Sequence, residues 1–158
     1  MTYRYLFLDI DGVLHSADAY TGVDNVKAPL QELQGLGLFV HLDLLTSLLA
    51  PHQDVSLVVH SSWRQTHDDE QLRLLFGPLA HLVVGATARE LDRRLSILES
   101  IVRLRIEPAQ YRVLDDQPEL LDGLEDFVIA CDSRLGLADL KAQRQLQNWL
   151  DTSRQGFG

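Results

Sequence analysis

Residues 3–12 read YRYLFLDIDG, an aromatic and aliphatic run that ends at two aspartates and a glycine. A short run of large apolar residues is typical of a buried strand, so a strand is expected over residues 3–8. Four more runs of this kind, each ended by polar residues or glycine, are VSLVV at 55–59, LVV at 82–84, YRVL at 111–114 and FVIA at 127–130. The sequence therefore predicts five short strands.

Segments with the apolar spacing of helices separate these strands. Helices are expected over 41–50, over 67–76 after Thr66 as N-cap, over 89–104 and near 138–150. The expected buried face of the 89–104 helix consists of Leu91, Leu95, Leu98, Ile101 and Val102. Strands that alternate with helices favour a three-layer, Rossmann-like α/β domain with a mostly parallel five-stranded sheet.

Length and composition indicate one globular domain over residues 1–158, in which residues 15–40 are rich in turn formers and are expected to form a loop or short flap. With 23 acidic against 14 basic residues, the net charge of -9 argues against DNA binding through phosphate neutralisation. The single cysteine, Cys131, excludes an internal disulfide and a multi-thiolate metal site. No apolar run approaches the roughly 18 residues of a membrane span. We therefore expect a cytoplasmic protein that does not bind membranes.

Three of the predicted strands end in polar residues. The first is followed by Asp9 and Asp11, the second by His60-Ser61-Ser62 and the fourth by Asp115-Asp116. In an open parallel sheet, ligands bind beyond the carboxyl ends of the strands, so these side chains are expected to meet there. Converging carboxylate and hydroxyl oxygens suit magnesium. Each aspartate taken singly could instead cap a helix or start a turn.

Three sequence strings resemble motifs of the haloacid dehalogenase-like (HAD) phosphatase superfamily. These are FLDIDGVL at 7–14, VVHSSWR at 58–64 and VLDD at 113–116. Together they are most similar to the small HAD-like domains of RNA-repair "Swiss army knife" polypeptides, and the resemblance spans residues 3 to about 150. It implies a HAD-like fold without a large cap domain.

The resemblance also implies roles for the acidic residues. Asp9 would be the nucleophile and Asp11 the general acid/base. Magnesium would be held by Asp9, the backbone carbonyl of Asp11 and Asp116, with Asp115 as a further candidate ligand. The expected activity is that of a magnesium-dependent phosphohydrolase, which acts on a phosphomonoester through an aspartyl-phosphate intermediate.

Phosphate binding is assigned by the same resemblance. Ser61 would hydrogen-bond the transferred phosphoryl group, with Ser62 as the alternative, although either serine could instead be a helix N-cap. The family usually has a lysine as its third motif, but no lysine occurs between residues 28 and 140. Arg93 is expected to supply this positive charge, with Arg94 as the alternative, because arginine can bind phosphate oxygens bidentately.

Two other functions remain to be weighed. A response-regulator receiver would carry its phosphate-accepting aspartate after the third strand. This sequence has Gly85-Ala86-Thr87 there, which argues against a receiver. A HAD-fold binding or regulatory module with little turnover stays open, because fold does not determine function. The expected partner is a phosphorylated substrate, either a small molecule or a macromolecular end, so nucleic acid is expected only as a substrate. Trp63 is expected to be a packing residue, and the histidines near the motifs are expected to be packing or surface residues.

Overall fold

A computed structural model describes residues 3–19 and 27–155 of the chain. Its centre is a five-stranded sheet in the order β3-β2-β1-β4-β5, in which every pairing is parallel. The strands are β1 (Arg4–Leu8), β2 (Val55–Val59), β3 (Val83–Ala86), β4 (Tyr111–Asp115) and β5 (Val128–Ala130). All five predicted strands are therefore present, and the α/β prediction is confirmed.

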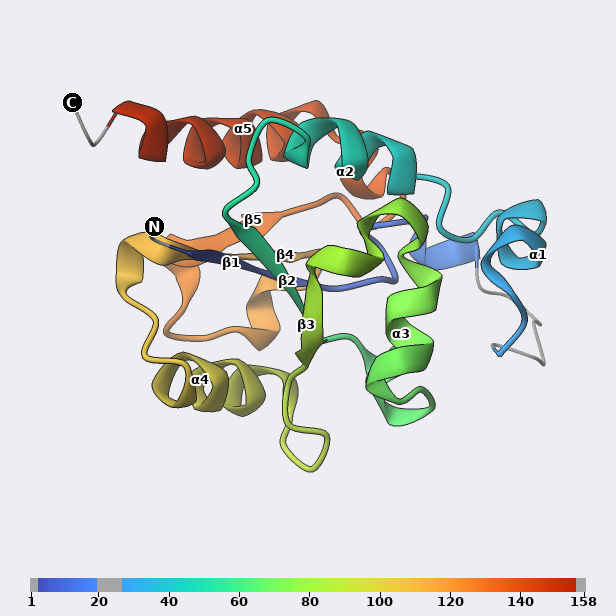
Figure 1. Cartoon of the computed structure of the whole chain (residues 1–158), viewed down its shortest axis with the longest axis horizontal. Coiled ribbons are helices and arrows are strands. Elements are labelled where there is room, and N and C mark those ends of the chain that lie inside the picture. Colours follow the sequence, from blue (N-terminus) through green and yellow to red (C-terminus); the bar gives the residue numbers. More distant parts are fainter. Residues whose placement is uncertain (1–2, 20–26, 156–158) are drawn as a thin grey trace.

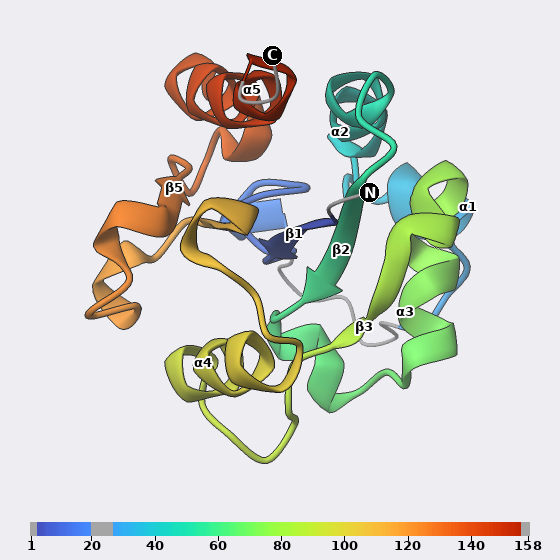
Figure 2. The same ribbon diagram turned by 60° about the vertical axis from the view of Figure 1, so that its left-hand side comes forward.

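Helices cover both faces of this sheet. Figure 2 shows α2 and α5 above it and α4 below it. The helices are α1 (Leu30–Gly35), α2 (Leu42–Leu49), α3 (Asp69–Leu75), α4 (Arg93–Arg103) and α5 (Leu140–Gln155). The central strand β1 alternates between two cores: Leu6 and Leu8 pack on the side of α2 and α5, whereas Phe7 packs on the side of α4. All three residues are fully buried, as expected for a strand covered on both faces.

The third strand differs from its predicted bounds. It was expected to end before Gly85, but β3 continues through Gly85 to Ala86. In the sheet, Gly85 pairs with Val58 and Ala86 with Val59. Pairing with β2 therefore extends the strand through Gly85, the residue that was expected from the sequence to end it.

Helix α4 is shorter than predicted and buries a different face. It begins at Arg93, because the side chain of Asp92 accepts a hydrogen bond from the backbone N–H of Leu95 and caps the helix. The buried residues are Ser96, Ile97 and Ser100, whereas Leu95 and Val102 are exposed. The serine hydroxyls donate to carbonyls one turn earlier in the helix, so they are satisfied without water. The predicted apolar face was therefore wrong for Leu95 and Val102, whereas Leu98 and Ile101 are partly buried against the core as expected.

Helix α3 also begins later than predicted. Its N-cap is Asp68, whose carboxylate accepts from the N–H of Gln71 while the Gln71 side chain accepts from the N–H of Asp68. Thr66 instead ends a 3-10 helix over Ser62–Gln65. The predicted cap at Thr66 was therefore wrong by two residues.

Part of the predicted flap belongs to the core. Within residues 15–40, α1 forms, and Leu33, Leu38 and Phe39 are fully buried in the core that α2 and α5 cover. The expectation of a loop or flap was wrong for this part, because its apolar side chains complete the core beside α2. Residues 20–26 of the segment lie outside the described residues.

The sheet order places a switch point beside β1. The chain runs from β1 outward to β2 and β3 and then returns to β4 on the opposite side of β1 (Figure 1). The carboxyl ends of β1 and β4 therefore border the crevice where ligands bind in such sheets. Within the described part of the chain, none of the helices has the length and apolar character needed to span a lipid bilayer.

The observed face of α4 predicts which of its apolar residues stabilises the fold. Ile97 is fully buried and Val102 is 77% exposed. Ile97→Ala should lower the free energy of unfolding by about 2–5 kcal/mol, because it leaves a cavity in the core. Val102→Ala should change it by less than about 0.5 kcal/mol. Urea unfolding of the two variants measures this, and an equal loss in both would contradict the packing of α4.

Candidate active site

Asp9 follows β1 and lies at the base of the crevice. Its backbone N–H donates to the carbonyl of Leu114 in β4 at 3.0 Å, and its Oδ1 accepts from the N–H of Ile10 at 2.8 Å. Only 3% of its side chain is exposed. Burial, together with the negative charges of Asp115 and Asp116, holds the pKa of Asp9 well above its ordinary value. The ionised form of Asp9 therefore needs a positive partner.

Asp115 ends β4 and is fully buried with its partners around it. Its Oδ1 accepts from Arg93 Nη1 at 2.9 Å and from the N–H of Gln117 at 2.8 Å. Its Oδ2 accepts from His60 Nε2 at 2.7 Å and from Arg93 Nη1 at 3.0 Å. Burial alone would raise the pKa of Asp115, but the hydrogen bond from His60 and the charge of Arg93 outweigh it, so this pKa is lowered. Asp115 is thus ionised, and residues of the chain already balance its negative charge.

His60 follows β2 and is fully buried. Burial lowers its pKa, so the imidazole is neutral at pH 7. A carboxylate can only accept, so the neutral ring donates its Nε2–H to Asp115. The positive charge beside Asp115 therefore comes from Arg93.

Arg93 is the first residue of α4 and extends over the ends of the central strands. Its Nη1 lies 3.6 Å from Asp9 Oδ2, in addition to its contacts with Asp115. The neighbouring Arg94 instead donates its Nε–H to the carbonyl of Asp122 at 2.6 Å. Of the two arginines considered from sequence, the structure brings Arg93 to the carboxylates.

Asp116 lies on the more open side of the group and is half-buried. Its carboxylate lies directly against Gly12, where a Cβ atom would overlap it, and Gly12 adopts a φ of +78°. Burial raises the pKa of Asp116, the hydrogen bond from Ser133 opposes this rise, and the charge of Asp115 adds to it. Gly12 therefore provides both the turn after Asp11 and the space that admits this second carboxylate.

Two sets of side chains could hold a cation at this edge. Ligand atoms of Asp9, His60 and Asp115 lie within 4.8 Å of one another. However, His60 Nε2 and both oxygens of Asp115 already bond each other or Arg93. The second set is Asp9 and Asp116: the charge of Asp116 raises the pKa of Asp9, and a hydrogen bond with Asp9 lowers the pKa of Asp116, so the two carboxylates are neighbours. Oxygen donors of this kind suit magnesium.

The carboxylate of Asp11 contacts two rings. Its Oδ1 lies 2.7 Å from His15 Nε2, and its Oδ2 accepts from Trp63 Nε1 at 3.0 Å. Its side chain is 34% exposed, in contrast to Asp9. Asp11 is thus the carboxylate that solvent and a ligand can reach.

The two serines after β2 differ in their surroundings. Ser61 is fully buried, and its Oγ accepts from the N–H of Trp63 at 3.1 Å, so it caps the 3-10 helix that follows. This is the capping role considered from sequence, and it leaves the hydroxyl hydrogen free to donate elsewhere. Ser62 is exposed. Arg64 fixes this turn by donating to the carbonyls of His60 and Ser61.

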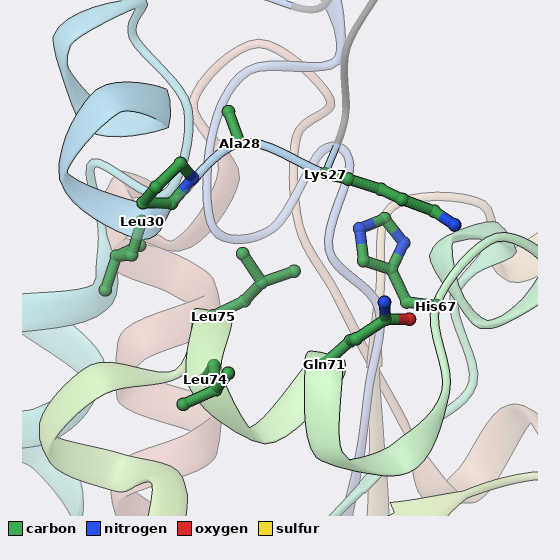
Figure 3. A pocket seen from close by; sticks show the side chains of 8 residues that line it. Lys27, Ala28, Leu30, His67, Gln71, Leu74 and Leu75 are labelled. Atoms are coloured by element: carbon green, nitrogen blue, oxygen red, sulfur yellow. The ribbon is translucent and has the colours of Figure 1, made fainter.

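A cavity of about 390 Å³ lies beyond Trp63, between the start of α1 and α3 (Figure 3). Lys27, His67 and Gln71 lie together at one end of it and Leu30, Leu74 and Leu75 at the other. The His67 ring packs on Trp63 with 5.3 Å between ring centroids. The tryptophan therefore separates this cavity from Asp11, and the site carboxylates do not line it.

The structure adds three residues that sequence reasoning set aside as packing or surface residues. His60 contacts Asp115, and both His15 and Trp63 contact Asp11. Each stands inside or directly after a motif string, in the sequences DGVLH and HSSW. Their position beside the acidic motifs was therefore visible, whereas the partner of each ring depends on the register of the sheet and the path of the loop.

Comparisons with known proteins agree with this arrangement. The model of the family described as "HAD domain in Swiss Army Knife RNA repair proteins" matches residues 5–142. Searches of the curated proteins and of the solved structures give no match. The matched region contains β2 to β5, all of β1 except Arg4, and every carboxylate discussed above. The chain is therefore a member of the HAD superfamily and belongs to the family of HAD domains found in Swiss Army Knife RNA repair proteins.

Proposed function

We propose that the protein is a magnesium-dependent phosphohydrolase that transfers a phosphoryl group to Asp9 before releasing it to water. The observation that carries this proposal is the grouping of Asp9, Asp116 and Arg93 at one strand edge, with Asp11 beside them. Family membership supports the same class of reaction. The grouping supplies a nucleophile, a cation site, a fixed positive charge and an accessible acid/base.

The donor set fits magnesium. Asp9 and Asp116 are neighbours in the fold, and the charge of Asp116 raises the pKa of Asp9. A divalent cation held by these two carboxylates would favour the ionised form of both, and the backbone carbonyl of Asp11 would be the third oxygen ligand that the family resemblance implies. When bound, the cation would neutralise charge on the phosphoryl oxygens and orient them for in-line attack.

The proposed reaction then has two steps, in which residues of the chain act as nucleophile and as acid/base. In the first, an oxygen of Asp9 attacks phosphorus, the bond from phosphorus to the leaving oxygen breaks, and Asp11 gives its proton to that oxygen. In the second, Asp11 takes a proton from water, the water oxygen attacks phosphorus, and the bond to Asp9 breaks. Arg93 stabilises the phosphoryl oxygens in both steps, and the Ser61 hydroxyl is the proposed additional donor.

A binding module without turnover is the second candidate, and the burial of Asp9 favours it. With 3% of its side chain exposed, Asp9 offers a phosphate ester little surface to contact. Hydrolysis of p-nitrophenyl phosphate, measured with magnesium and with excess EDTA, distinguishes the two candidates. Turnover that requires magnesium supports the phosphohydrolase, and binding of phosphate esters without turnover supports the module.

The role of Asp9 predicts the effect of its amide variant. Asp9→Asn should lower kcat for p-nitrophenyl phosphate by several orders of magnitude, because a neutral amide is a poor nucleophile and a poor metal ligand. Its melting temperature should not fall, because the variant removes a buried charge. Asp43→Asn, at an exposed position in α2, is the matched control and should keep wild-type activity. An active Asp9→Asn variant would rule out Asp9 as nucleophile.

The proposed cation site predicts a magnesium-dependent gain in stability. Magnesium at ~100 times its Kd should add about 2.7 kcal/mol to the free energy of unfolding. For a chain of this size that corresponds to a rise of roughly 5–10 °C in Tm. Differential scanning fluorimetry measures the rise, with potassium chloride at equal ionic strength as the control. Asp116→Asn should lose most of it; an unchanged curve for wild type would contradict the site.

The accessibility of Asp11 predicts weak selection among small substrates. A site with an acid that is 34% exposed encloses little of its ligand, so small phosphomonoesters should show a high KM. Kinetics with sugar phosphates, phosphorylated oligonucleotide ends and phosphopeptides check this. A micromolar KM for one small metabolite, without activity on the larger substrates, would contradict it.

A further inference from the structure

The carboxylate of Asp11 is held between two rings that come from distant parts of the chain. We infer that His15 and Trp63 are positioning residues, which hold Asp11 in the orientation needed to protonate the leaving oxygen. The inference rests on the proposed function, in which Asp11 is the acid/base. It assigns to two buried residues a role in the reaction beyond the packing expected of them.

The contacts restrain the carboxylate from both sides. His15 Nε2 lies 2.7 Å from Oδ1, and Trp63 Nε1 lies 3.0 Å from Oδ2. Rotation of the carboxylate about its terminal torsion would break both hydrogen bonds together. Each oxygen has two lone pairs, so one on each remains for a proton. With 34% of the side chain exposed, that proton can face a bound ester.

The hydrogen bonds of His15 determine which ring nitrogen carries the proton. The backbone N–H of Phe39 points at His15 Nδ1, with 3.0 Å between the nitrogens. An N–H can only donate, so Nδ1 accepts and carries no proton. The proton of the neutral ring is therefore on Nε2, from which it is donated to Asp11. The ring is held as a donor toward the carboxylate.

The surroundings of the two rings keep them in place. His15 is fully buried and Trp63 is 5% exposed. Phe39 packs edge-on against both rings, at 5.5 Å from His15 and 5.2 Å from Trp63 between centroids. Phe39 itself has a φ of +55°, a left-handed conformation that is strained for a bulky residue. The fold keeps this strain where it directs the Phe39 N–H at His15.

The orientation of Asp11 should affect the rate of cleavage only for leaving groups that must receive a proton from Asp11. A p-nitrophenolate ion leaves without protonation, whereas an alkoxide is strongly basic and must be protonated as the bond to phosphorus breaks. A misplaced Asp11 should therefore slow the cleavage of alkyl phosphates more than that of p-nitrophenyl phosphate. A loss of stability alone would slow both substrates equally.

The experiment compares kcat/KM for p-nitrophenyl phosphate and glycerol phosphate, because this constant reports the steps up to the phosphorylation of Asp9. The variants are His15→Leu, which removes the donor, and Trp63→Phe, which removes the indole N–H. His15→Gln is the conservative variant, because its amide can donate near the position of Nε2. Phe76→Leu is the matched control: Phe76 packs on Phe39 at 6.4 Å but belongs to neither hydrogen bond.

We expect His15→Leu to lower kcat/KM about 100-fold for glycerol phosphate, the lower end of what general acid catalysis contributes, and less than about 5-fold for p-nitrophenyl phosphate. Trp63→Phe should shift the ratio in the same direction by about 10-fold, within the range of one lost hydrogen bond. His15→Gln should restore most of the ratio. Phe76→Leu should lower Tm and leave the ratio unchanged.

Equal losses for both substrates in His15→Leu and Trp63→Phe, or no loss in either, would overturn the inference. If His15→Leu does not fold, Trp63→Phe and His15→Gln decide it by the same ratio. Failure of the proposed function looks different: the wild-type protein would be inactive on both esters, or Asp9→Asn would stay active. A wild type that depends on Asp9, with an unchanged ratio in the variants, would overturn the positioning role alone.

Discussion

Two aspartates at the ends of neighbouring parallel strands are the electrostatic constraint on which the site depends. The register of β1 and β4 pairs Leu8 with Leu114, so Asp9 and Asp115 follow side by side and both are buried. Burying two ionised carboxylates side by side, away from water, costs free energy unless each has a positive partner. Helix α4 supplies one positive partner from within the chain. The second partner, in the proposed function, is a bound cation.

The permanent partner is Arg93, which α4 presents from beneath the sheet. Because His60 and Arg93 together satisfy Asp115, this aspartate serves to hold the guanidinium close to Asp9. Removing Arg93 would leave the buried charge of Asp115 uncompensated, and removing His60 would leave one of its hydrogen bonds unmade, so the three residues act as a unit. Asp116, next in the chain, lies against Gly12 and belongs to the proposed cation site. Asp115 and Asp116, although adjacent in the chain, therefore differ in their partners: Asp115 is bound to residues of the chain, and Asp116 is a proposed ligand of the cation.

Asp11, the proposed acid/base, has different surroundings from this group of charges. It is two residues beyond Asp9 in the chain, and its carboxylate contacts His15 and Trp63, whose rings pack on Phe39. The proposed nucleophile and the proposed acid/base therefore differ in their partners: Asp9 lies near the charge of Arg93, whereas Asp11 is held by hydrogen bonds from two rings.

The sequence by itself determined the alternation of strands and helices, the HAD resemblance and the acidic residues that end β1 and β4, because apolar runs and the polar residues after them are local properties of the chain. It could not determine the whole buried face of α4, where Ile97 and two serines that bond within their own helix are buried in place of the expected Leu95 and Val102. Nor could it pair His60 with Asp115 or Trp63 with Asp11. Those pairings join residues more than fifty positions apart, and only the strand order and register bring them within hydrogen-bond distance.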